Sequence, residues 1–131
     1  MALDYKIDHQ QRLVATRCSG TLTDADVFHY QRDVWSQPEV QGYNELVDMT
    51  DVEQVELPSV GRARQLAAVS AKMDGEAPPS KFAIVAVTEL HYGLGRMYSS
   101  WRNTDERSKK EVSVFRSRAE ALAWLGVKDP A

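Results

Sequence analysis

The sequence lacks the features that mark secreted and membrane-spanning proteins. Cys18 is the only cysteine, so no disulfide can form within the chain, which fits a reducing compartment. The longest apolar run, residues 82–87, is far too short to span a bilayer. The first residues also lack the apolar core of a secretory signal. We therefore expect a cytoplasmic protein, and peripheral contact with a membrane stays open.

An excess of positive charge is also missing. The chain has 16 Lys and Arg against 19 Asp and Glu, which gives a formal net charge of −3. Proteins that bind nucleic acid depend on clustered positive charge that neutralises phosphates. We therefore expect no nucleic-acid partner.

The sequence carries none of the common motifs of catalytic sites. Its three histidines and single cysteine do not show the spacing of metal ligands. The segment Tyr92-Gly93-Leu94-Gly95-Arg96 holds only a short Gly-x-Gly, not a phosphate-binding loop, and there is no nucleophile elbow. The sequence therefore predicts no metal, no cofactor and no catalytic residues.

The composition that is present is typical of one globular domain. With 131 residues, 43% of them hydrophobic and 27% charged, the chain can bury a core of its own. It contains no repeat and no linker, so residues 1–131 are expected to form a single domain.

The apolar pattern predicts five strands. The first two alternate apolar and polar residues and form a hairpin that Gly20 ends, whereas residues 82–87 are apolar throughout, as in a strand covered by helices on both faces. The strands are expected at residues 5–7, 13–18, 45–49, 82–87 and 109–115.

Four helices are predicted between and after these strands. Thr23 can cap the first helix, Pro58 suits the first turn of the second, and Ser117 with Glu120 forms a capping box for the last. The third helix carries an apolar stripe that consists of Leu90, Leu94, Met97, Tyr98 and Trp101. The order ββαβαβαβα predicts an α/β fold: a mixed five-stranded sheet with four helices, in which the first strand is antiparallel.

Four segments carry a resemblance to a known family: residues 20–23, 46–48, 92–98 and 114–125. In this order they resemble the SpoIIAA-like group of small bacterial proteins, which is related to the STAS and SEC14/CRAL-TRIO domains. The resemblance covers nearly the whole chain. It implies a STAS-like fold and a non-enzymatic binding or regulatory module.

The resemblance also implies where a phosphorylation site would lie. In the STAS family a partner kinase phosphorylates a serine at the start of the second helix, in an Asp-Ser-Ser-Gly-like motif. Aligning Asp48 with the family places residues 56–59 at that motif, where Leu57 and Pro58 stand in place of the serines. Ser59 is displaced by one residue, so we do not expect phosphorylation at Ser59.

Three hypotheses for function follow. The first is a STAS-like regulatory module that binds a protein partner. The second is a carrier or sensor of a small apolar or amphipathic ligand, with membrane association as an open variant. The third is an enzyme, which ranks last because no catalytic constellation stands out. A homodimer is compatible with all three, because an uncovered edge strand often pairs with a second copy.

A ligand site is expected in two regions. In SEC14-like relatives the third helix and the sheet enclose an apolar ligand. The glycines beside aromatic residues on this helix indicate a loosely held first turn or a close backbone approach, and either would allow the helix to act as a lid. Polar residues at a strand end and at the next helix start form the second region, which α/β proteins often use. Core packing and helix capping are the alternatives for both. The candidates are Asp48, Thr50, Ser59, Arg62, Tyr92, Arg96, Met97, Tyr98 and Trp101.

Overall fold

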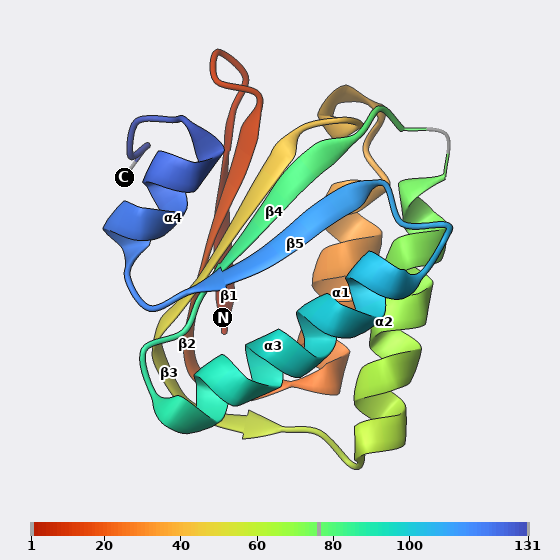
Figure 1. The fold of residues 1–131 in the computed structure, drawn as a ribbon, viewed down its shortest axis with the longest axis vertical. Helices are drawn as coiled ribbons and strands as arrows, with labels where there is room; N and C mark the ends of the chain where they lie inside the picture. Colours follow the sequence, from red (N-terminus) through yellow and green to blue (C-terminus); the bar gives the residue numbers. More distant parts are fainter. Residues whose placement is uncertain (1, 76, 131) are drawn as a thin grey trace.

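A mixed sheet of five strands forms the centre of the molecule in the computed structural model, which describes residues 2–75 and 77–130 (Figure 1). The strands lie in sequence order, with β1 antiparallel to β2 and the others parallel. The strands are β1 (Leu3–Asp8), β2 (Leu13–Thr23), β3 (Asn44–Glu56), β4 (Ser80–Val85) and β5 (Lys110–Phe115). The predicted fold class is therefore confirmed.

The helices cover the two faces of the sheet unequally. Figure 1 shows α1, α2 and α3 on one face and α4 alone on the other. Among the described residues there is also one short 3-10 turn, Pro38–Val40. The helices are α1 (Asp24–Trp35), α2 (Val60–Asp74), α3 (Glu89–Thr104) and α4 (Arg118–Leu125).

Alternation along the strands divides the core between the two faces. Leu13 and Ala15 of β2 pack with Ala121 and Leu125 of α4, whereas Val14, between them, packs beneath α1. Successive strand residues point to opposite faces, so one strand contributes to both layers. The second layer, beneath α1, α2 and α3, contains the candidate site described below.

Local capping fixes several helix ends. Thr23 and Asp26 form a full capping box at α1, which confirms Thr23 as the predicted cap. The Ser117 hydroxyl accepts from the Glu120 amide as expected, but the Glu120 carboxylate contacts that hydroxyl and not the backbone. The role of Pro58 was predicted wrongly, because Ser59 caps α2 and Pro58 precedes the helix.

β2 and β3 continue well beyond their predicted ends, whereas β4 ends at Val85, two residues before its predicted end. Gly20 does not end β2; it adopts a positive φ of 65° inside the strand, next to two shifts of register against β3. Such bulges bend a strand without ending it. Residues beyond Gly20 therefore continue to pair with the second half of β3, as far as Glu56. This extension carries Leu22 and Val55 beyond the main sheet, beside the pocket described below.

The apolar stripe of α3 begins one turn later than predicted. Leu90 is 69% exposed, whereas the neighbouring His91 is buried. Gly95 faces the sheet, where an added Cβ would lie 3.1 Å from a Val114 methyl. The predicted close backbone approach is thus confirmed at Gly95, while Gly93 has open space around it.

Candidate functional site

The polar group predicted at a strand end lies inside β3, because the strand continues to Glu56, and it forms a buried ion pair. The Asp48 carboxylate accepts from the backbone amide and hydroxyl of Thr50, and from Arg118 Nη1 of α4 at 3.0 Å. Burial opposes ionisation, but these hydrogen bonds hold the pKa of Asp48 below its ordinary value. Arg118 also pairs with Asp129. The carboxylate of Asp48 is thus fully engaged within the protein.

Ser59 and Arg62 belong to a different cluster, at the start of α2. The Ser59 hydroxyl caps the helix by accepting from the Arg62 amide. Arg62 Nε donates to Asp24 Oδ2 at 2.8 Å and so connects the first turns of α1 and α2. Within residues 2–75 and 77–130, no hydrogen bond joins this cluster to Asp48 or Thr50. The structure therefore separates the strand-end candidates from the helix-start candidates.

The candidates on α3 also divide into two groups. Tyr92 lies under the Arg116 guanidinium, 4.0 Å from ring centroid to carbon, and Arg96 is exposed. Met97, Tyr98 and Trp101 instead line an apolar pocket. With Leu94, the predicted stripe thus contributes four of its five residues to one wall of a site.

This pocket lies between the sheet and the three helices that share its face. Its volume is about 140 Å³. The sheet wall includes Leu3, Cys18, Val47, Met49, Phe82 and Ile84. The helix wall includes Val27, Ala63, Leu66, Leu94, Met97 and Trp101. The lining is almost wholly apolar, so it suits a hydrocarbon or aromatic group and offers little to a polar one.

Glu45 is the one carboxylate among the lining residues, and its oxygens are occupied. Oε2 accepts from Tyr30 at 2.8 Å and from Trp35 Nε1 at 3.1 Å. Oε1 accepts from Lys110 Nζ at 2.6 Å, and this ammonium lies 3.1 Å from the Trp35 ring centroid. Burial raises the pKa of Tyr30 and lowers the pKa of Lys110. The hydrogen bonds to these three side chains therefore fix the Glu45 side chain in the wall of the pocket.

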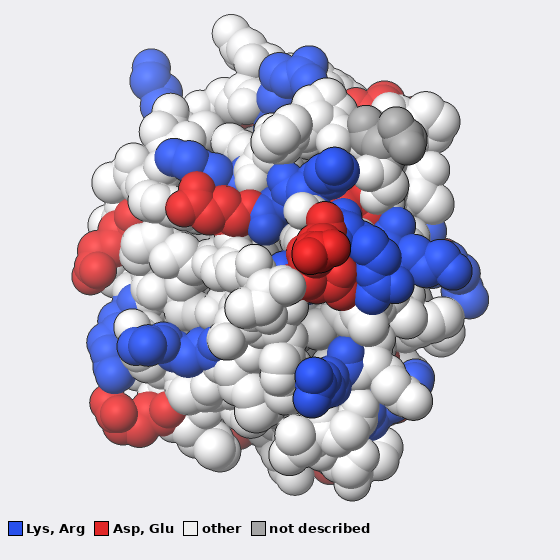
Figure 2. All heavy atoms as spheres, turned by 45° about the vertical axis from the view of Figure 1, so that its right-hand side comes forward, with Lys and Arg blue, Asp and Glu red and all other residues white. Residues whose placement is uncertain are grey.

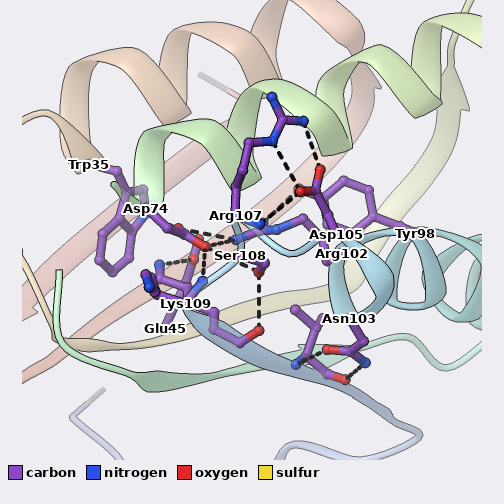
Figure 3. Close-up of polar contacts among 12 residues, drawn as sticks. Trp35, Glu45, Asp74, Tyr98, Arg102, Asn103, Asp105, Arg107, Ser108 and Lys109 are labelled. Atoms are coloured by element: carbon purple, nitrogen blue, oxygen red, sulfur yellow. Dashed lines mark hydrogen bonds and ion pairs between the residues drawn. The ribbon is translucent and has the colours of Figure 1, made fainter. Parts of the chain in front are cut away.

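A third buried ion pair fixes the far end of α3, as Figure 3 shows. Arg102 donates to both oxygens of Asp74, at 3.2 and 3.3 Å, and to the Tyr98 hydroxyl at 3.0 Å. The Ser108 hydroxyl and the Lys109 amide also donate to Asp74. These contacts join the ends of α2 and α3 to the loop before β5, so the last turn of α3 is anchored beside the pocket.

Cys18 contributes a thiol to the pocket wall. Burial raises the pKa of Cys18 to about 12, with smaller contributions from nearby carboxylates. A thiol with this pKa stays protonated at neutral pH and is a poor nucleophile. Among the described residues, His, Cys, Asp and Glu side chains form no cluster of three or more that could hold a metal.

Much of the pocket could not be predicted from the sequence. Leu22, Val55 and Leu57 come from the extension of β2 and β3 and the residues just after it, which the sequence did not reveal. For Glu45 and Lys110 the sequence predicts only that they lie in strands. A charged residue in an otherwise apolar strand is the signal that could have marked Glu45 as part of a buried pair.

The surface carries charges of both signs. Figure 2 shows the side of the molecule that includes α2, and there Lys and Arg lie beside Asp and Glu with uncharged surface between them. No helix among the described residues is long and apolar enough to cross a membrane.

The similarity of this chain to known proteins lies in its fold. No protein-family model matches the sequence, and no curated protein matches it significantly. A structure of an uncharacterised protein of the DUF3478 family from Shewanella loihica PV-4, described as having a SpoIIAA-like fold, is similar with a TM-score of 0.60. The two sequences are 20% identical, and the match covers 95% of this chain and 93% of the other. The resemblance seen in the sequence is thus confirmed at the level of the fold, and the chain has a SpoIIAA-like fold.

Proposed function

We propose that the protein is a non-enzymatic binding module that holds a small apolar ligand between its sheet and α1, α2 and α3. The observation that carries the proposal is the apolar pocket of about 140 Å³. Protein interiors are close-packed, and voids larger than a water molecule are few. A dry cavity of comparable size, ~150 Å³, lined by Leu, Ile and Phe, binds benzene in another protein.

The energy of an empty pocket supports the proposal. When no ligand is bound, the apolar side chains of the lining lack packing partners on their pocket side or face water, and both lower the stability of the fold. An apolar ligand that fills the pocket recovers this energy and leaves no polar group unpaired.

The polar groups near the pocket favour binding over catalysis. Both oxygens of Glu45 are bonded to protein donors, and the Cys18 thiol stays protonated. A general base or nucleophile must reach a reacting atom in the site. The side chains beside the pocket are engaged in holding its wall, which supports a carrier or sensor of a hydrocarbon or small aromatic ligand.

Benzene is a suitable probe, read by methyl NMR. We expect saturable shifts at Val47, Leu66 and Ile84, which line the pocket, and none at Leu13 and Val40, which are buried elsewhere. The control methyls separate pocket binding from a general effect of the additive.

A matched pair of variants tests the location. Ala63→Leu places a larger side chain in the pocket, whereas Ala25→Leu makes the same change at an exposed position of α1. Benzene should shift the lining methyls of Ala25→Leu and not those of Ala63→Leu. Shifts that persist in Ala63→Leu, or their absence from the unmodified protein, would show that the pocket is not a binding site.

A further inference from the structure

The two edges of the sheet differ in how their backbone groups are used. At the β5 edge, the Asn103 side chain from α3 donates to the Val112 carbonyl and accepts from the Val112 amide, both at 2.9 Å (Figure 3). This pair occupies outward-facing backbone groups in the middle of β5. A further strand cannot add at this edge without displacing Asn103.

The β1 edge is open. The Ser19 amide donates to the Ala2 carbonyl, and Leu3 lies opposite Cys18. Hydrogen-bonded and non-bonded pairs alternate in an antiparallel ladder. The amides and carbonyls of Leu3, Tyr5 and Ile7 therefore point away from β2. Among the described residues, no side chain bonds to these groups.

The sequence of β1 is complementary to itself about Tyr5. In an antiparallel pair of two copies centred there, each Asp4 lies opposite Lys6 of the other copy, and each Leu3 lies opposite Ile7. Asp4 and Lys6 are exposed, and Tyr5 is 49% exposed. The Lys6 ammonium donates to the Pro130 carbonyl at 2.9 Å and keeps two further hydrogens for a carboxylate. Opposite charges and aromatic pairs that face one another across strands are stabilising. In this one register, the charges, the side-chain sizes and the outward backbone groups of the two copies are complementary.

We propose that β1 pairs antiparallel with β1 of a second copy of this chain, about a two-fold axis at Tyr5. The central sheet then continues across the dimer, and the same surface is used by both copies. Tyr5 lies beside its symmetry mate and exchanges backbone hydrogen bonds with it. Two Asp4–Lys6 pairs flank this contact, one on each side of the axis.

Other symmetric registers are less favourable. A pairing centred on Asp4 or on Lys6 places that charge opposite its own copy, which is destabilising. A pairing centred on Ile7 brings Lys6 opposite Asp8, but it leaves most of β1 unpaired, because the strand ends at Asp8. The Asp8 carboxylate also already accepts two hydrogen bonds from Gln11. The register at Tyr5 pairs the most residues without a like-charge contact.

Charge reversal tests the register by sedimentation across a dilution series. Asp4→Lys and Lys6→Glu each create two like-charge contacts, and we expect each to weaken the dimer roughly tenfold to hundredfold. The double variant Asp4→Lys, Lys6→Glu restores opposite charges across the axis, so it should regain the dimer. Both side chains are exposed, so circular dichroism should show an unchanged fold.

A backbone variant tests the hydrogen bonds independently. Tyr5→Pro removes an outward amide and no bond to β2, a substitution that edge strands tolerate. Tyr5→Ala removes the same side chain and keeps the amide. We expect Tyr5→Pro to dimerise more weakly than Tyr5→Ala. A protein that stays monomeric at every concentration, or a dimer that both charge reversals leave unchanged, would overturn the proposal.

Discussion

The buried pair of Glu45 and Lys110 allows a quantitative prediction about the pocket wall. Their side chains are only 2% and 7% exposed, and 2.6 Å separates Oε1 from Nζ. Lys110→Met leaves the carboxylate buried without its cation, and Glu45→Gln leaves the ammonium buried without its anion. Breaking a buried pair by removing one partner typically costs about 3–5 kcal/mol.

We expect both variants to be destabilised, although in each of them the remaining charge keeps some of its contacts. After Lys110→Met, Tyr30 and Trp35 still donate to the carboxylate, so a loss at the lower limit, about 3 kcal/mol, is expected. After Glu45→Gln, the ammonium retains the Trp35 ring, whose attraction for a desolvated cation is worth about 2 kcal/mol. Each single variant should thus be strongly destabilised.

The double variant provides the decisive comparison. Once both charges are gone, neither partner is left unpaired, so Glu45→Gln with Lys110→Met should lose less stability than the two single losses together. We expect a coupling energy of about 2 kcal/mol or more from urea unfolding of the four proteins. Losses that add to within about 0.5 kcal/mol would refute the reasoning, because independent sites behave in that way.

Two further predictions concern Cys18 and the glycines of α3. Because the pKa of Cys18 rises from 9.0 to about 12 on folding, the thiol's contribution to stability is complete below pH 9 and is lost as the pH rises toward 12. In Cys18→Val, the free energy of unfolding measured by urea titration should therefore fall less steeply between pH 9 and 12 than in the unmodified protein. An identical dependence on pH in the two proteins would contradict this cause. Gly93→Ala should raise the unfolding midpoint, since helix propensity improves by about 1 kcal/mol and its Cβ meets nothing within 4 Å. Gly95→Ala should lower the midpoint, because its Cβ would lie 3.1 Å from Val114; equal effects would show that the close approach is absent.

The order of elements could be predicted because its signals are local. Thr23 caps α1 through a hydroxyl and an amide three residues apart, and residues 82–85 are apolar because helices cover both faces of the sheet. These features depend on neighbouring residues or on simple periodicity. The end of β2 could not be predicted, because the sequence does not distinguish a glycine in a bulge, such as Gly20, from a glycine in a turn.

The candidate site could be predicted only on its helical side. The stripe on α3 identified Met97, Tyr98 and Trp101, since residues three and four apart share a helix face. The opposite wall depends on contacts between distant segments, as does the pairing of Glu45 with Lys110, which are 65 residues apart. A single sequence does not show which residues pair with each other, so the partner of Glu45 first becomes apparent in the fold.

Native mass spectrometry of the gently purified protein, repeated after denaturation, tests the central claim most directly. The unmodified protein should carry a reproducible extra mass that denaturation releases, and Ala25→Leu should carry the same mass. Ala63→Leu, whose larger side chain takes up part of the pocket, should be bare. An unmodified protein without any added mass, or an added mass that Ala63→Leu retains, would contradict a ligand held between the sheet and the three helices.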